Sequence, residues 1–272
     1  MKPLFERQDE LFWPTEHCAS PWGPVTIHGG ASSGLLAWAV EAQIPAGMQL
    51  ARLTVDLYRP VPREPLGVTA RVVRESRRLR LLEALLYHDG REIGRASALA
   101  LATAEVVIPA HARLDAQPPA PLREALERPP VIGINAIANR VGREYSAGLH
   151  TLVPLKPVAL ELGVGRGCTW VQLPVELIGG IPNSPLVRVA TLADFSNGFA
   201  QLHLDADTGF INADLTLNLH RMPEGEWIGI DARTRAQPHG VAMAESELYD
   251  VRGLIGRVSQ SNLTMARLGG KG

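Results

Sequence analysis

The chain has 272 residues, of which 46% are apolar and 20% are charged, and its formal net charge is −1. This balance allows a large buried core and excludes a disordered or low-complexity chain. With 5% aromatic residues and no basic excess, it indicates neither a nucleic-acid partner nor a polybasic membrane signal.

The N-terminal residues mix charged and apolar side chains and lack the apolar centre of a signal peptide. The longest apolar stretch, residues 96–110, contains Ser97, Thr103 and Glu105 and is shorter than the roughly 20 residues of a membrane-spanning helix. Cys18 and Cys168 cannot build a zinc site alone and suggest no disulfide framework. We therefore expect a soluble, cytoplasmic protein with no membrane partner and no metal site.

Residues 28–41 form a run that is apolar on nearly all sides and long enough for about three helical turns, which is typical of a buried helix. Strand-like patterns follow, separated by turn residues such as Arg77-Arg78 and Asp89-Gly90. Asp89-Gly90 is a strong hairpin signal. The pattern predicts an entry strand, then one helix, then about four antiparallel strands that wrap around it, the four at residues 53–61, 66–76, 79–89 and 92–108.

Residues 108–130 hold six prolines, which is the composition of a linker. Residues 131–165 are either an excursion over the surface or the start of the second half. Beyond them, residues 168–175 and 186–193 are predicted as strands. The chain is accordingly divided into an N-terminal unit, a proline-rich linker with its excursion, and a C-terminal unit, at residues 1–107, 108–165 and 166–272.

The second half of the chain repeats the first. Residues 53–102 align without a gap to residues 215–264, an offset of 162 positions, and 16 of the 50 pairs are identical. After a two-residue shift, residues 28–41 match residues 192–205, which predicts a second helix there. Two such halves can pair their sheets edge to edge, which removes an exposed sheet edge.

This repeated plan resembles the double-hotdog acyl-CoA thioesterases, in the family called acyl-CoA thioesterase II or TesB-like. The likeness covers about residues 20–267 and includes HGG before the first helix, LYRPVP after it, and the later LADF, NLHR and VSQSNLTMAR segments. It implies an α+β fold, a tandem hotdog in which each half is an antiparallel sheet wrapped around one long central helix. It also implies hydrolysis of acyl-CoA thioesters in fatty acid metabolism, with CoA present as part of the substrate and no further cofactor.

In that family a water molecule is oriented by an Asp, a Thr or Ser, and a Gln, all from the second half. Matched motif by motif, the Asp falls on Asp194 and the Gln on Gln260. The position of the hydroxyl residue holds Asn212, which departs from the family pattern. Amide groups both donate and accept hydrogen bonds, so Asn212 and Gln260 can still hold a water between them.

The residues by themselves leave two interpretations of Asp194. Asp is a favoured N-cap, and Asp194 stands at the expected start of the second helix. A carboxylate there could also act as a general base, with the helix dipole and burial acting in opposite directions on its pKa. The repeat favours function, because the counterparts of Asp194, Asn212 and Gln260 in the first half are Gly30, Leu50 and Ala98.

The first half is expected to form the other wall of the site. Gly29 and Gly30 allow a substrate close to the backbone, and their N–H groups at a helix N-terminus could receive an oxyanion. His28 before them is a candidate substrate-binding residue. The alternatives are a tight turn for the glycines and a buried, backbone-bonded ring for His28.

Two other functions remain open on the same fold. A hydratase or dehydratase of acyl thioesters needs an Asp/His or Glu/His pair that faces the acyl chain, and His203, nine positions after Asp194, does not clearly offer it. A non-catalytic acyl-CoA-binding protein is suggested by Asn212. In either case, exposed sheet faces favour pairing of chains into a homo-oligomer, with a covered monomer as the alternative.

Three further patterns are weaker. Residues 30–34 fit the G-x-S-x-G nucleophile elbow around Ser32. The hydrolase fold that carries this elbow, however, has no tandem repeat of this kind. The metal-like residues His203, Asp205 and Asp207 have no second cluster to complete a site. The basic run could meet the phosphates of coenzyme A or form a solvated hairpin, and it consists of Arg74, Arg77, Arg78 and Arg80.

Overall fold

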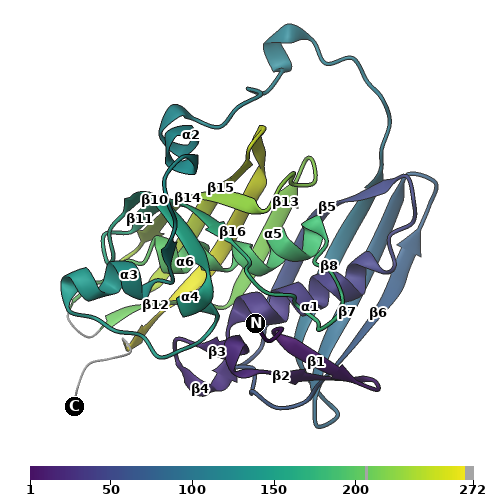
Figure 1. Ribbon diagram of the computed structural model, residues 1–272. Helices are drawn as coiled ribbons and strands as arrows, with labels where there is room; N and C mark the ends of the chain where they lie inside the picture. Colours follow the sequence, from purple (N-terminus) through teal and green to yellow (C-terminus); the bar gives the residue numbers. More distant parts are fainter. Residues whose placement is uncertain (206–207, 267–272) are drawn as a thin grey trace.

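The computed structural model describes residues 1–205 and 208–266, with its helices and strands shown in Figure 1. The first half contains the expected buried helix and four antiparallel strands. The turn after the third of these strands has positive φ at Asp89 (50°) and Gly90 (70°), the conformation that this residue pair favours in a hairpin. The elements are α1 (Gly29–Glu41), β5 (Met48–Leu57), β6 (Leu66–Glu75), β7 (Leu79–His88) and β8 (Arg91–Ala102).

The N-terminal residues supply the expected entry strand before α1 and add further elements that the sequence did not predict. The hairpin of β1 (Phe5–Gln8) and β2 (Leu11–Pro14) extends the sheet, because β2 pairs with β6. After the 3-10 helix η1 (Glu16–Cys18), the short strands β3 (Ala19–Ser20) and β4 (Gly23–Ile27) form a separate pair. Strand β4 ends at Ile27, directly before His28, which is the N-cap of α1.

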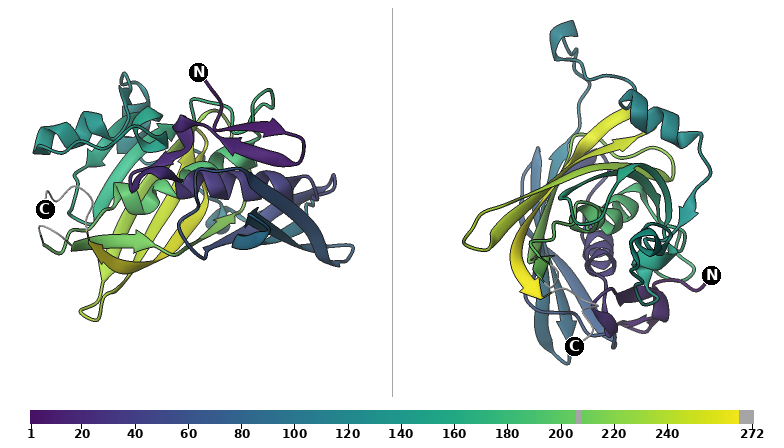
Figure 2. Two further views of the ribbon diagram at one scale, coloured as in Figure 1. Left: turned by 90° about the horizontal axis from the view of Figure 1, so that it is seen from below. Right: turned by 90° about the vertical axis from the view of Figure 1, so that its left-hand side faces the viewer.

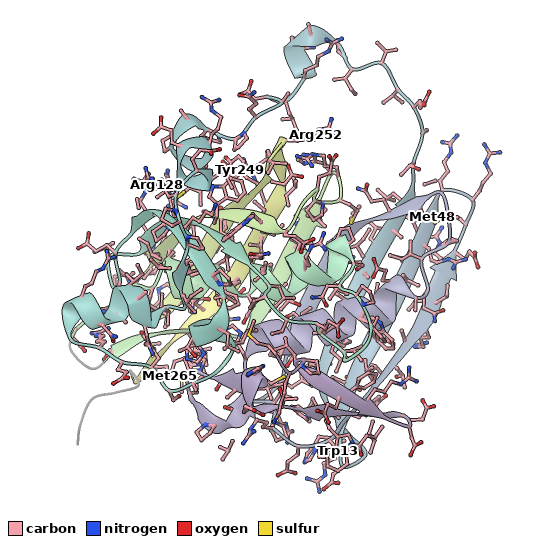
Figure 3. The ribbon with its side chains drawn as sticks, viewed as in Figure 1. Trp13, Met48, Arg128, Tyr249, Arg252 and Met265 are labelled. Carbon is pink, nitrogen blue, oxygen red and sulfur yellow. The ribbon has the colours of Figure 1, made fainter. Side chains whose placement is uncertain are left out.

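The expected linker packs against the outer face of the sheet in the second half of the chain. It holds the 3-10 helix η2 (Ala110–Ala112) and helix α2 (Ala120–Leu126), whose Leu122 and Ala125 pack with Trp170 and Tyr249 into a small second core. Trp170 Nε1 donates a hydrogen bond to the carbonyl of Leu122 at 2.7 Å. Figure 3 labels Tyr249 beside this helix. The linker is therefore anchored against the outside of the sheet.

The excursion that follows is partly regular. It consists of β9 (Val131–Ile132), α3 (Asn135–Ala138), the 3-10 helix η3 (Asn139–Val141), α4 (Leu149–Leu152) and β10 (Pro154–Leu160). Strand β10 pairs with both β9 and β11 (Arg166–Gln172), which corresponds to the strand predicted at residues 168–175. The part of the sheet that belongs to the second half thus begins before residue 166.

The strand predicted at residues 186–193 is wrong, because this segment is helix α5 (Pro185–Ala193). Its β-branched residues resemble a strand. However, Ser184 Oγ accepts a hydrogen bond from the Val187 N–H at 3.1 Å, and Pro185 occupies the first helical position, so the segment has a complete helix start. After Asp194 comes α6 (Phe195–Phe199), so the helical segment begins and ends earlier than the predicted 192–205.

The two halves join at a strand edge, as predicted. Strand β13 pairs antiparallel with β5 of the first half and β16 of the second, which produces one continuous 14-stranded sheet. Along its main path the order is β1-β2-β6-β7-β8-β5-β13-β16-β15-β14-β11-β10-β9, with β12 paired to β16. The remaining strands of the second half are β12 (Thr208–Asn212), β13 (Asp214–Leu219), β14 (Trp227–Ala236), β15 (Val241–Asp250) and β16 (Gly253–Ala266).

Helices α1 and α5 lie together inside the curve of the sheet, and in the right-hand view of Figure 2 both are seen nearly end-on. Gly29 faces Asp194 beyond the end of α5, while Glu41 accepts a hydrogen bond from Ser184 before its start, so the helices run antiparallel. One core cluster draws on both halves. Among the described residues, no helix is long and apolar enough to cross a membrane.

Candidate active site

Asp194 lies between α5 and α6 with helical backbone angles, and it is 7% exposed. Within the described ranges its side chain makes no capping hydrogen bond to α6, so the interpretation as an N-cap is wrong. The carboxylate instead points at the other half of the chain. Both of its oxygens lie 2.8 Å from the position that a Cβ on Gly29 would occupy. Asp194 therefore sits at the N-terminus of α1, where the helix dipole favours a negative charge.

His28 pairs with Asp194 across the two halves. Its Nδ1 lies 3.0 Å from Asp194 Oδ2, and both side chains are buried. Phe195 stacks on the imidazole with ring centroids 4.7 Å apart. His28 and Asp194 thus form an Asp/His pair, which the sequence did not clearly offer at His203.

Two strands of the second half bring amide groups to the same carboxylate. Asn212, the last residue of β12, donates through Nδ2 to Asp194 Oδ1 at 3.0 Å. Gln260 on β16 is fully buried, and its Nε2 lies 3.3 Å from the Asp194 carbonyl and 3.5 Å from Oδ1. The structure thus gathers the three second-half residues that the sequence singled out.

A second layer of polar residues, missed by the sequence, holds this arrangement. Gln260 Oε1 accepts the Asn197 N–H of α6 at 2.8 Å. Asn262, paired with Asn212 across β12 and β16, donates to Asn197 Oδ1 at 2.8 Å. The sequence did offer a signal for Asn262, because side chains alternate between the two faces of a strand and Asn262 therefore shares one face of β16 with Gln260.

The predicted oxyanion pair needs a correction at Gly30. Its N–H faces His28 Nδ1 at 3.0 Å and is therefore engaged. A Cβ on Gly30 would lie 2.4 Å from the carbonyl oxygen of Thr191, so this glycine permits close contact between α1 and α5. The ring of His28 is buried and bonded to the backbone, as the alternative interpretation has it, and it also contacts Asp194. Of the two glycine amides, the Gly29 N–H is the remaining candidate.

Another ring enters the site from the excursion. His150 of α4 is 5% exposed and stacks on His28 with centroids 6.0 Å apart. Burial of the ring, followed by the nearby His28, lowers the pKa of His150 to about 3. The sequence contained no signal for this placement, because α4 lies outside the repeat.

The first-half counterparts form no second site in the described structure. Leu50 and Ala98 are buried in the apolar core, and Gly30 is closed against the backbone of Thr191. The polar groups around Asp194 are therefore present in the second half only. At the related positions of the first half, apolar side chains and a glycine pack in their place.

The weaker sequence patterns do not assemble into sites. Ser32 is fully buried, and its hydroxyl has no hydrogen-bond partner in the described structure. His203 contacts Arg143 and Gln201; burial, and then Arg143, lowers its pKa. Asp207 lies outside the described residues, and those that are described contain no group of three metal-ligating side chains.

The basic run lies on the hairpin of β6 and β7, where Arg74, Arg77 and Arg78 are exposed. Arg80 pairs with Glu75 in the same hairpin and donates to the carbonyl of Gln43 at 2.7 Å. Beside it, Arg71 pairs with Glu83 across β6 and β7. These contacts are structural, and none of them involves a residue of the Asp194 cluster.

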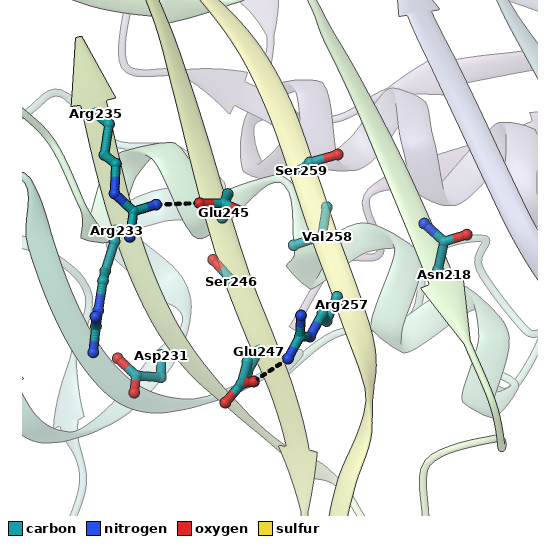
Figure 4. Close-up of a pocket in the computed structure, with 10 residues that line it drawn as sticks. All are labelled: Asn218, Asp231, Arg233, Arg235, Glu245, Ser246, Glu247, Arg257, Val258 and Ser259. Atoms are coloured by element: carbon teal, nitrogen blue, oxygen red, sulfur yellow. Dashed lines mark hydrogen bonds and ion pairs between the residues drawn. The ribbon is translucent and has the colours of Figure 1, made fainter.

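A hollow of about 420 Å³ lies on the outer face of the sheet, in the second half of the chain (Figure 4). Its charged lining contains two ion pairs, Arg235 with Glu245 and Arg257 with Glu247. Ser259 lines this hollow while the next residue, Gln260, reaches Asp194. Since neighbouring residues of a strand point to opposite faces, the sheet separates the hollow from the Asp194 cluster.

Comparisons with known proteins agree with this fold. The family model of the acyl-CoA thioesterase N-terminal domain matches residues 18–104, and that of the C-terminal domain matches residues 145–264. No curated protein matches the chain significantly.

Three solved structures share the overall fold along nearly the whole chain. Acyl-CoA thioesterase II TesB2 from Mycobacterium marinum is 15% identical, with a TM-score of 0.64 over 98% of this chain and 96% of that one. A hot dog fold protein of unknown function from Alicyclobacillus acidocaldarius is 16% identical, with a TM-score of 0.69 over 97% and 96%. The tesB protein of Mycobacterium avium subs paratuberculosis is 14% identical, with a TM-score of 0.59 over 96% of each chain. With the two family domains spanning most of its length, the chain belongs to the acyl-CoA thioesterase family, as a TesB-like double hotdog and a thioester hydrolase.

Proposed function

We propose that Asp194, oriented by Asn212 and Gln260, activates the water that hydrolyses an acyl-CoA thioester. The observation that carries this proposal is the convergence of two amide side chains and the His28 ring on one buried carboxylate. A carboxylate held in this way has few other orientations available. It is therefore suited to position a water and to receive its proton.

The chemical steps follow from this arrangement. Asp194 takes a proton as the water oxygen attacks the thioester carbonyl carbon, and negative charge develops on the carbonyl oxygen. The Gly29 N–H, at the start of α1, donates to that oxygen. When the carbon–sulfur bond breaks, Asp194 gives the proton that it took from the water to the CoA sulfur. The products are a free acid and CoA, and the steps use no group beyond the CoA of the substrate.

Asn212 can take the place of the hydroxyl residue of the family. Its Nδ2 already donates to Asp194, and its carbonyl oxygen supplies an acceptor for the water. The departure from Thr or Ser therefore keeps the hydrogen-bonding capacity of the position. This weakens the case for a non-catalytic acyl-CoA-binding protein, which depended on Asn212.

The decisive experiment compares the wild type with Asp194→Asn on acyl-CoAs of graded chain length. We expect the variant to keep its fold and to lose about 100-fold or more in turnover, the size of a general-base contribution. Asp231→Asn is the matched control, because Asp231 lines the hollow on the opposite face of the sheet. Full turnover in Asp194→Asn, on a substrate that the wild type hydrolyses well, would remove Asp194 from the mechanism.

The His28–Asp194 pair also favours a second candidate function. An acid and a base 3.0 Å apart could add water across the double bond of an enoyl thioester, with one group activating the water and the other protonating the neighbouring carbon. Assays of enoyl-CoA hydration beside hydrolysis of the saturated thioester separate the two reactions. Hydration that is much faster than hydrolysis would replace the first proposal with the second.

A further inference from the structure

The segment that carries His150 is held firmly against the first half. Gly148, just before α4, donates its N–H to Thr151 Oγ1 at 3.0 Å, and the Ile134 N–H donates to the carbonyl of His150 at 2.9 Å. A Cβ on Gly148 would lie 2.1 Å from the carbonyl oxygen of Ala19, so the two backbones touch. The position of the His150 ring is thus determined by several independent contacts.

In the part of the chain that the structure describes, the ring nitrogens of His150 make no hydrogen bond of full geometry, although the Ser146 backbone lies near enough to oppose part of the lowering of the pKa of His150. His150 is 5% exposed, and in the described structure neither of its ring nitrogens meets a partner with hydrogen-bond geometry. A neutral imidazole has one N–H donor and one acceptor nitrogen. Buried polar groups are nearly always satisfied, so an unpartnered pair in a fixed ring requires an explanation.

The ring stands beside the reacting pair. It stacks on His28 at an interplanar angle of 21°, and Tyr145 covers it edge-on with centroids 5.9 Å apart. The ring is neutral over the physiological range, because burial lowers its pKa to about 3. A neutral, buried donor suits an uncharged acceptor such as a carbonyl oxygen, and it does not suit a phosphate.

The site also needs another donor. An oxyanion is commonly stabilised by more than one hydrogen bond, and the Gly30 N–H is already engaged by His28. We propose that His150 is a substrate-binding residue whose ring N–H donates to the carbonyl oxygen of the acyl thioester, alongside the Gly29 N–H. This inference rests on the proposed thioester hydrolysis at Asp194.

Two unreactive analogues of the substrate test this contact directly. In a ketone analogue, a methylene replaces the sulfur of the acyl-CoA and the carbonyl remains; an S-alkyl-CoA thioether keeps the sulfur and lacks the carbonyl. His150→Phe keeps the ring stack and removes both nitrogens. We expect this variant to bind the ketone about tenfold more weakly in calorimetry, as for one lost hydrogen bond, and to bind the thioether with unchanged affinity.

Control variants separate this contact from a structural effect. Tyr145→Phe changes the same enclosure but keeps its edge-on ring, and it should leave the preference for the ketone intact. His150→Asn or His150→Gln restores an N–H near one of the two ring nitrogens, and at least one of them should recover part of that preference. Thermal melting of each variant confirms that the fold is kept.

The failures of the two proposals give different results. If Asp194→Asn loses hydrolysis while His150→Phe weakens both analogues equally, or neither, the role of His150 is overturned and the mechanism at Asp194 stands. If the wild type hydrolyses no acyl-CoA and does not prefer the ketone over the thioether, both proposals are overturned. A selective loss of ketone affinity in His150→Phe, with a parallel drop in kcat/KM, supports the contact.

Discussion

The hydroxyl oxygens of Thr54 and Thr216 lie 3.2 Å apart, and these two residues are one repeat, or 162 positions, apart in the chain. They face each other where β5 pairs antiparallel with β13. A residue meets its own counterpart only on a twofold axis, so the pseudo-twofold axis of the duplication passes between them. Around this axis the backbone plan is repeated, while the polar cluster at Asp194 is not.

The shared sheet and core predict that the two halves unfold together. One core cluster joins both halves, and the β5–β13 ladder connects their strands, so neither half keeps its buried surface alone. We expect hydrogen exchange in β7 and β15 to report the same opening free energy, and denaturant curves from different probes to coincide. Exchange that is clearly faster throughout one half would show that the halves are separate cooperative units.

Substitutions at Asn212 test whether its amide replaces the family hydroxyl. Asn212→Leu introduces the type of residue found at the first-half counterpart and removes the hydrogen bond to Asp194. We expect turnover to fall about 10- to 100-fold, as for a lost hydrogen bond to a charged group, whereas Asn212→Thr should keep most of it. Steady-state kinetics measure both, with Asn218→Leu on the outer face as the control. Wild-type turnover in Asn212→Leu would contradict the role of the amide.

The contact between α1 and α5 predicts a strong effect at Gly34. A Cβ there would lie 2.2 Å from Thr191 Oγ1, so Gly34→Ala should lower the free energy of unfolding by about 1–3 kcal/mol or more. Gly198→Ala is the matched control, because its Cβ meets nothing within 4 Å and alanine is the better helix former. In a Thr191→Ala background the cost of Gly34→Ala should shrink. Urea denaturation measures these four variants, and an additive double mutant would disprove the clash.

Burial of His150 predicts a dependence of stability on pH. The pKa of His150 is lowered from 6.5 to about 3 in the folded chain. Between these values the unfolded chain binds a proton there and the native chain does not, so stability falls as the pH falls below 6.5. The contribution of His150 between pH 7 and pH 5 is about 2 kcal/mol.

Denaturant unfolding at the two pH values measures this contribution. We expect His150→Phe to lose about 2 kcal/mol less than the wild type on acidification, because phenylalanine has no proton to bind. His111→Gln, at an exposed position of the linker, serves as the control and should follow the wild type. Identical losses in the wild type and His150→Phe would show that His150 is not buried as a neutral ring.

The helical segment of the second half shows where local patterns fail. Val187, Val189 and Thr191 resemble a strand, yet they lie in α5. The cap by Ser184 and the proline after it were visible in the sequence, but their effect depends on a helix that can bury its β-branched residues against α1. That condition is a property of the packing and not of the segment itself.

The sequence by itself determined the duplicated plan and the strands of the first half, and it singled out Asp194, Asn212 and Gln260 as candidate site residues, because periodicity, turn residues and repeated motifs are local records. Only the tertiary structure decided that Asp194 faces the start of α1, that His28 is its partner, and that the Gly30 N–H is engaged. It also brought His150 from outside the repeat to the same site. These relationships depend on how closely two helices and an excursion pack, which is a balance of long-range contacts that no short stretch of residues encodes.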